Sequence, residues 1–570
     1  MSAESAGRRV HVLGSEDAES DDLLYACFVK PPNDVIDKSI LAGRWGTGKT
    51  AYMFHKTAAL EEFLSSIDKR QDKIWYIAEN SLDVPPIKSL RTIFDGDDDA
   101  IRACLEKVWE TAIVVSFIRQ LQLIRQTIRT PKGEHWNYIE LIYVGHIRSS
   151  SVWKSAKHLL DGIFGVERGG ALTQVIDTLA PLTGEDVRQN IKLCIDDLPS
   201  HIPVPMVAVE PLETPGSTGT VGGVMADMLM TCLLNAFQRI TSVDEKKRLS
   251  LIIAIPWHRF SERRLDRPQK LTQHIGHLKW DKARLRALIN KRLMFELQDS
   301  RRGSFDLPGG LDAWQYVFGS NQKNSRVNVN EDTFDYVLRH THYRVRELIR
   351  FSRRAIEVEA NEADKSAFDV LGRRNDRIVS EDSLREAVSE ISVRTAKQRI
   401  TEGTRLYESL ALATDAMSGM SCPFSVEELD KRMQYNQVKE ISSKSIIQLM
   451  EVLWECGVIG AQITTSSASE SRYIERTYGH TTRAPNLPRV KSGREDNSSR
   501  PGNMKLGYSK ESVSRFYLFE HNTSKDDLSV ASIIKYGSTS DEKVTLDWVF
   551  HPMMFEHLSV RLHADYVIGT

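Results

Sequence analysis

The sequence lacks the features of a secreted or membrane-spanning protein. Its six cysteines stand singly, without the paired spacing of a disulfide framework or a zinc site. No apolar run approaches the roughly 18 residues that a membrane helix requires, and the amino-terminal segment has no apolar stretch of the kind found in signal peptides. These absences predict a cytoplasmic protein that does not contact a membrane and holds no structural metal.

The chain also lacks an excess of charge of either sign. It carries 76 Lys and Arg residues against 77 Asp and Glu residues, for a formal net charge of −1. This balance excludes a protein that binds nucleic acid through its overall charge, although it is compatible with a local basic segment. At 570 residues the chain is too long for one compact core, which predicts three or four domains.

One segment near the amino terminus matches the phosphate-binding pattern G-x-x-x-x-G-K-[ST] at every position. A short apolar run at 39–42 precedes it, and a segment with helical apolar spacing at 51–66 follows it, so the predicted context is strand, glycine loop and helix. The loop consists of Gly43, Arg44, Trp45, Gly46, Thr47, Gly48, Lys49 and Thr50.

The chemistry of phosphate binding explains these residue types. Glycines let backbone N–H groups turn towards phosphate oxygens, and the amino terminus of the helix adds a positive dipole. Lys49 is expected to reach the β- and γ-phosphates, and the Thr50 hydroxyl is expected to coordinate Mg²⁺. The sequence therefore predicts a site for ATP and Mg²⁺.

A loop of this kind also needs an acidic residue at the end of a second buried strand, where it helps to hold the metal. The run at 205–209, which is followed by Glu210, has the unbroken hydrophobicity of a parallel strand covered on both faces. We expect Glu210 to hold Mg²⁺ together with Thr50, and Glu213 to polarise the attacking water. Because glutamate is one methylene longer than the usual aspartate, we expect slow hydrolysis.

A second acidic pair competes for this role. Asp196 and Asp197 follow the run at 191–195, which is shorter and carries a lysine at position 192. Aspartate is the usual residue type here, whereas the longer and more apolar strand favours Glu210 and Glu213. The sequence leaves this choice open.

Six segments, taken in chain order, resemble bacterial P-loop ATPases of the AAA+/STAND type, which are built like origin-recognition ATPases. The segments are GSEDAESDDLLYACFV, GRWGTGKT, PMVAVEPLE, LSLIIAIPWHRF, HLKWDKARLRALINKRL and HTHYRVRELIRFSRRAI. In the last segment Val345 replaces the proline of the R-P-R motif of the family. The resemblance implies an ATP-controlled switch that forms homo-oligomers and regulates a separate effector protein, with relatives in anti-phage defence loci.

Three arginines are candidates for sensing or catalysis. Arg344 and Arg346 lie two residues apart at the start of a predicted lid helix, from which an arginine can reach the γ-phosphate and report its presence as closure. Arg259 follows the sensor-like strand, and the hypothesis for it is a catalytic arginine finger that acts across a subunit boundary. The alternative for these side chains is a solvated cationic surface.

The expected fold class is an α/β P-loop NTPase core, with a parallel sheet and helices on both faces, followed by a helical lid and a winged-helix domain. Within the core, the acidic cluster at 95–99 is expected to cap the next helix. The predicted domains are an amino-terminal segment (1–30), the ATPase core (31–300) with a helical insertion at about 92–200, the lid (301–400) and the winged-helix domain (401–570).

The winged-helix domain is predicted to carry a long basic wing loop at 464–510. Between positions 471 and 505 the chain has eight Lys or Arg residues against three acidic residues, in a composition rich in Ser, Thr, Gly and Pro that predicts a flexible loop. Such a loop would grip a phosphate backbone while Tyr473 and Tyr478 stack on bases. This defines the alternative function, an ATP-regulated DNA-binding protein of the initiator or repressor type.

Overall fold

The computed structural model describes most of the chain between residues 11 and 562. Trp45, Glu213, Arg259 and the segment 484–510 of the expected wing loop lie outside the described residues. The description omits 32, 45, 69–72, 79–89, 93, 129–132, 148–178, 211–219, 243–248, 257–270, 302–304, 325–328, 373–376, 405–409, 437, 439–445, 479–481, 484–513, 520–528 and 540–543.

The chain divides into two compact units. The core unit is Ser15–Trp280, and the carboxyl unit combines Met1–Gly14 with Asp281–Thr570. The boundary therefore falls at Trp280, whereas the sequence placed the end of the ATPase core at about residue 300. The difference arises because helix α11 (Lys282–Ser300) packs on helices that follow it in the chain.

The core unit is built on a parallel sheet of five strands in the order β2-β3-β4-β1-β5. Strand β1 pairs with β4 on one side and with β5 on the other, and the interior of β3 is fully buried, as its unbroken apolar run predicted. This confirms an α/β core with a parallel sheet. The strands are β1 (Ile40–Gly43), β2 (Tyr76–Ala78), β3 (Met206–Glu210), β4 (Ser250–Pro256) and β5 (Ile275–His277).

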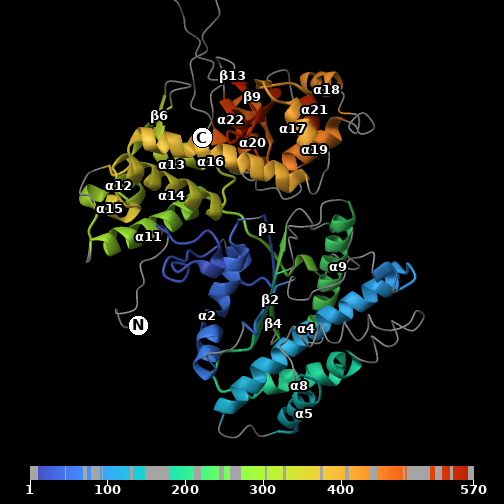
Figure 1. Ribbon diagram of the computed structural model, residues 1–570. Coiled ribbons are helices and arrows are strands. Elements are labelled where there is room, and N and C mark those ends of the chain that lie inside the picture. Colours follow the sequence, from blue (N-terminus) through green and yellow to red (C-terminus); the bar gives the residue numbers. More distant parts are fainter. Residues whose placement is uncertain are drawn as a thin grey trace, which may run out of the picture. The chain divides into compact units, whose positions relative to one another are not determined.

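Helices pack on this sheet. Helix α2 (Lys49–Ile67) directly follows the glycine loop and contacts β1, β3 and β4, and helix α9 (Thr220–Ser242) lies between β3 and β4 in the chain. Figure 1 shows α2 and α9 on opposite sides of the strands. Two short elements, η1 (Ala18–Ser20) and α1 (Asn33–Ile36), precede β1.

The segment between β2 and β3 contains the helices that the sequence predicted as an insertion. Asp97 caps the first of them by accepting hydrogen bonds from the N–H groups of Asp99 and Ala100, at 2.9 and 3.0 Å, so the role expected for the acidic cluster is confirmed. The described elements are α4 (Asp98–Thr127), α5 (Glu134–Ile142), the π-helix η3 (Tyr143–Ile147) and α8 (Glu185–Asp196).

Helix α8 corrects one of the two hypotheses for the acidic strand. Residues 191–196 are the end of this helix, and Asp196 is its last residue. The buried residues Val187, Ile191, Cys194 and Ile195 recur at intervals of three and four, which is a helical spacing that the short apolar run concealed. Asp196 and Asp197 therefore end a helix and not a strand of the sheet.

The first part of the carboxyl unit is mainly helical, as expected for the region 301–400. A small antiparallel hairpin, β6 (Asn321–Asn324) with β7 (Val329–Asp332), interrupts the helices. After α11 come η6 (Pro308–Gly310), α12 (Ala313–Phe318), α13 (Thr333–Leu338), α14 (Val345–Glu362), α15 (Ala367–Leu371) and α16 (Glu381–Thr404).

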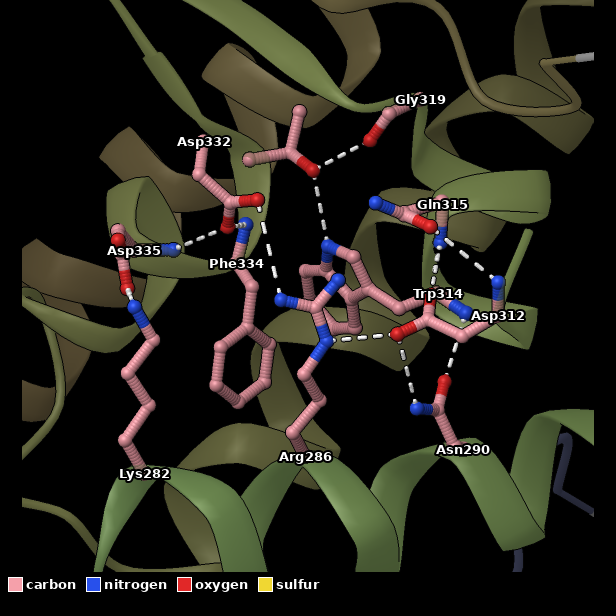
Figure 2. A network of polar contacts seen from close by, with 11 residues as sticks. Lys282, Arg286, Asn290, Asp312, Trp314, Gln315, Gly319, Asp332, Phe334 and Asp335 are labelled. Atoms are coloured by element: carbon pink, nitrogen blue, oxygen red, sulfur yellow. Dashed lines mark hydrogen bonds and ion pairs between the residues drawn. The ribbon is translucent and has the colours of Figure 1, made fainter. Parts of the chain in front are cut away.

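Arg286 of α11 orients the starts of two of these helices, as Figure 2 shows. Its Nε donates a hydrogen bond of 2.7 Å to Asp312, the N-cap of α12, and its Nη1 lies 3.8 Å from Asp332, the N-cap of α13. Asn290, about one turn further along α11, also donates to Asp312, at 3.2 Å. Each carboxylate thus caps its own helix, while Asp312 also accepts hydrogen bonds from α11 and Asp332 forms an ion pair with it.

The rest of the carboxyl unit contains an antiparallel sheet of four strands in the order β10-β11-β9-β12. Two of its strands are Ser514–Leu518 and Val544–Phe550, and the helix before the sheet ends close to Gly457, which has a φ of +71°. The elements are α17 (Leu410–Ala416), β8 (Ser421–Cys422), α18 (Val426–Tyr435), α19 (Ile446–Glu455), β9 (Ile459–Thr465), α20 (Ala468–Tyr478), β10 (Thr482–Arg483), β11 (Ser514–Leu518), α21 (Val530–Thr539), β12 (Val544–Phe550), α22 (Met554–His557) and β13 (Arg561–Leu562).

The beginning of the expected wing loop is ordered secondary structure. Residues 468–478 form α20, whose Ile474 is buried in the core of the unit. The ring of Tyr473, predicted to stack on bases, stacks instead on Tyr536, with 5.5 Å between ring centroids. The composition of this stretch indicated a loop, but its buried isoleucine and stacked tyrosine stabilise a helix.

Among the described helices, none combines the length and the apolar character needed to cross a membrane.

Candidate nucleotide-binding site

The glycine loop lies between the carboxyl end of β1 and the amino end of α2, as the sequence predicted. Gly46 and Gly48 have φ angles of +76° and +89°, in the left-handed region that disfavours other residue types. A side chain at Gly43 would also be obstructed, because its Cβ would lie 2.8 Å from the Thr47 hydroxyl oxygen. The glycines are therefore required by the shape of the loop.

Lys49 supplies a buried positive charge within this loop. Its side chain is 6% exposed, and its Nζ donates to the carbonyl oxygens of Gly43 and Arg44, both at 3.0 Å. The Thr47 hydroxyl donates to the same Arg44 carbonyl at 2.7 Å. The ammonium group thus faces oxygen atoms of the loop itself, and a phosphate would compete with these carbonyls for it.

The hydroxyl of Thr50 meets the carboxylate of Glu210. Thr50 Oγ1, in the first turn of α2, donates to Glu210 Oε1 at 2.7 Å, and Glu210 is the last residue of β3. The two residues are 160 positions apart in the chain. Of the two acidic pairs considered from the sequence, it is therefore Glu210 and Glu213 that contribute a residue beside the loop, namely Glu210.

Tyr76 completes this arrangement, although no sequence motif includes it. Its hydroxyl donates to Glu210 Oε2 at 2.5 Å. Burial and the adjacent Glu210 carboxylate raise the pKa of this hydroxyl well above its ordinary value, so it remains a donor. The alternation of side chains along a strand is the pattern that could have identified Tyr76. Tyr76 pairs with Ala208, and Ala208 lies on the same face of β3 as Glu210.

The donor set fits a magnesium nucleotide. A hydroxyl and a carboxylate oxygen, 2.7 Å apart on two different elements, are hard ligands of the type that Mg²⁺ prefers. The buried ammonium and the left-handed glycines of the adjacent loop suit phosphate oxygens. Among the described residues no separate cluster of three or more His, Cys, Asp or Glu side chains gathers to hold a metal.

The remaining arginine candidates belong to the carboxyl unit. Arg344 is the N-cap residue of α14 and only 2% exposed, and its Nη1 lies 3.6 Å from Glu347 Oε1. Glu347 also accepts hydrogen bonds from the backbone N–H of His342 at 2.6 Å and from Arg399 at 2.5 Å. Within this unit Arg344 is thus part of a buried ionic cluster and not of a solvated surface.

A pair of stacked histidines adjoins Glu347. The rings of His342 and His551 are 4.1 Å apart and nearly parallel, and both side chains are buried. Burial, followed by the neighbouring His342, lowers the pKa of His551 well below its ordinary value. Arg399 also lowers the pKa of His551, whereas Glu347 raises it. His551 is therefore neutral near pH 7.

We expect His551 to make the carboxyl unit less stable in acid. The unfolded chain takes up a proton near pH 6.5 and the folded chain does not, so stability is lost as the pH falls below 6.5. Between pH 7 and pH 5.5 the loss from this histidine should be about 1 kcal/mol. The substitution His551→Asn keeps an acceptor for the Met553 N–H and should abolish this loss of stability. Urea unfolding of the wild type and of His551→Asn at pH 7 and pH 5.5 measures the difference.

The comparison of the two proteins measures His551 together with its effect on Glu347. Burial raises the pKa of Glu347 to about 7 and His551 acts to lower it, so this carboxyl contributes stability that is lost as the pH rises in both proteins. Equal pH dependence of the wild type and His551→Asn would contradict the prediction.

Comparisons with protein-family models, with curated proteins and with solved structures each found no match.

Proposed function

We propose that this chain is a Mg²⁺-dependent ATP-binding protein and an ATPase of low turnover, in which the nucleotide controls a conformational switch. The observation that carries the proposal is the hydrogen bond between Thr50 and Glu210. It joins the last residue of the phosphate-binding pattern to an acidic residue at the end of a buried parallel strand. The parallel sheet and the sequence pattern at 43–50 support the same assignment.

Each residue of the site has a defined part in this proposal. The backbone N–H groups of the loop and the ammonium of Lys49 bind and orient the β- and γ-phosphates. Thr50 and Glu210 would hold Mg²⁺, which when bound neutralises charge on the phosphate oxygens. Tyr76 holds one carboxylate oxygen of Glu210 in place. Glu213, three residues after the strand, is proposed to orient the attacking water.

The wider role is an oligomeric switch that regulates a separate effector protein, with anti-phage defence as a proposed setting. This part of the proposal is supported by the resemblance of the sequence segments to AAA+/STAND ATPases. A nucleotide can drive such a switch only by binding two conformations with different affinity. The alternative of a DNA-binding protein depends mainly on the basic residues at 484–505, outside the described residues, because the beginning of the expected wing loop forms helix α20.

Glu210→Gln should make ATP binding largely independent of Mg²⁺. The amide keeps the shape of the side chain but removes the charge that faces the metal, so the affinity for ATP in Mg²⁺ should fall about 10- to 100-fold. Binding in EDTA should change little. Titration of fluorescent ATP, with and without Mg²⁺, measures both values.

The matched control is Glu62→Gln, which neutralises an exposed glutamate on helix α2 and should leave both affinities unchanged. If the gain in affinity from Mg²⁺ is the same in Glu210→Gln as in the wild type, Glu210 does not hold the metal.

A further inference from the structure

Strand β5 brings the chain to the glycine loop. It pairs in parallel with β1, with His277 opposite Ala42, and the next N–H, of Leu278, donates to the Ala42 carbonyl at 2.8 Å. Two residues later the indole Nε1 of Trp280 donates to the carbonyl oxygen of Thr47 at 2.7 Å. Thr47 belongs to the loop, and 233 positions separate it from Trp280.

Trp280 is also the last residue of the core unit. Asp281, which follows it, is the first residue of this part of the carboxyl unit and the N-cap of α11, where it accepts a hydrogen bond from the Arg284 N–H at 2.8 Å. No spacer separates the residue that contacts the loop from the residue that starts the helix. A change at the Thr47 carbonyl therefore has a short covalent route to α11.

The other covalent connection between the two units is anchored on the same helix. Leu13, which is fully buried with a φ of +64°, donates its N–H to Glu296 at 2.9 Å and accepts a hydrogen bond from Arg292 at 2.6 Å. Both partners are buried residues of α11. We call these contacts the amino-terminal clamp. The core unit begins two residues later, at Ser15.

Phosphate binding should change the hydrogen bonds of the glycine loop. The carbonyl of Arg44 accepts hydrogen bonds from both Lys49 and the Thr47 hydroxyl. When Lys49 turns to a phosphate, that carbonyl loses one donor and the loop N–H groups acquire new acceptors. The backbone around Thr47, including the carbonyl that Trp280 contacts, is part of this rearrangement.

We propose that Trp280 is a positioning residue through which phosphate binding at the glycine loop changes the state of α11 and of the amino-terminal clamp. This inference rests on the proposed nucleotide site and adds the route by which that site regulates the rest of the chain. Both covalent connections between the units contact α11, and Arg353 of α14 also holds the amino-terminal one by donating to the carbonyl oxygens of Val12 and Gly14.

Hydrogen exchange of the full chain, with and without a non-hydrolysable ATP analogue and Mg²⁺, tests this route. In the wild type we expect slower exchange at 43–50, at the first turns of α11 and at 11–14, by about fivefold at α11, the factor that one net hydrogen bond contributes. In Trp280→Phe, which keeps the ring but not the indole N–H, the loop should still respond while α11 and 11–14 do not. ATP affinity should change no more than about fivefold.

Two further variants make the result specific. Trp109→Phe removes an indole-to-carbonyl hydrogen bond of 3.1 Å, to Leu229, elsewhere in the core unit, and should respond like the wild type. Insertion of two glycines between Trp280 and Asp281 keeps the indole contact but lengthens the link, so it should abolish the response of α11 without substituting an aromatic residue.

The outcomes separate the two proposals. A wild-type protein that binds the analogue without a response at α11 overturns the route alone, as does a full response at α11 in Trp280→Phe and in the insertion. A loss of response in Trp109→Phe equal to that in Trp280→Phe also overturns it, because the effect would then be general destabilisation. A wild-type protein with no binding and no response at 43–50 overturns the proposed function and the route with it.

Discussion

Lys49→Ala should lower the affinity for ATP by at least about 100-fold. Lys49 is the buried cation of the glycine loop, and its hydrogen bonds to loop carbonyls show that the ammonium is already desolvated and directed at oxygen atoms. Two charge-assisted hydrogen bonds to phosphates are worth more than two orders of magnitude in affinity. Isothermal titration of the full chain with ATP and Mg²⁺ measures the change.

The loss should not result from unfolding. Removing Lys49 leaves the Arg44 carbonyl with the Thr47 hydroxyl as a donor, so the free energy of unfolding should change by only about 1 kcal/mol. Lys56→Ala, at an exposed position about two turns further along α2, is the matched control and should bind ATP normally. Wild-type affinity in Lys49→Ala would remove the glycine loop as the nucleotide site.

Above its raised pKa of about 7, where Glu347 is ionised, Glu347→Gln should destabilise the carboxyl unit by about 3–5 kcal/mol. The substitution keeps the shape of the side chain but removes the negative charge that the buried Arg344 and Arg399 face at that pH. An uncompensated buried charge costs several kcal/mol. Urea unfolding monitored by hydrogen exchange in peptides from α14 and α16 reports on this unit separately from the core unit.

The control for this prediction lies on the same helix. Glu357 pairs with Arg354 at 3.6 Å, and its side chain is 41% exposed, so Glu357→Gln should cost less than about 1 kcal/mol. A cost for Glu347→Gln as small as that of the control would mean that the ionic cluster is not a source of stability. In that case a substitution of Arg344 would also leave the carboxyl unit folded.

Local chemistry is what the sequence determines in this protein. The spacing of three glycines, a lysine and a threonine specifies the turn at 43–50, because the left-handed φ angles and the close contact at Gly43 depend on residues within the loop. The run at 205–209 predicts a buried strand, and Asp97 predicts a helix start, for equally local reasons. The parallel sheet and the helices after β2 could be predicted on this basis.

The tertiary structure alone determines which distant residues meet the loop. Thr50 bonds to Glu210 across 160 positions, Tyr76 to Glu210 across 134 and Trp280 to Thr47 across 233. The order of strands in the sheet sets these contacts, and no local pattern encodes it. The same reason explains why the sequence left Asp196 and Asp197 as alternatives and placed the end of the ATPase core at residue 300, while the compact core unit ends at Trp280. For Asp196 and Asp197, the short apolar run before them is compatible with both a strand and a helix until its neighbours are known. For the boundary, α11 joins the carboxyl unit because it packs on helices later in the chain.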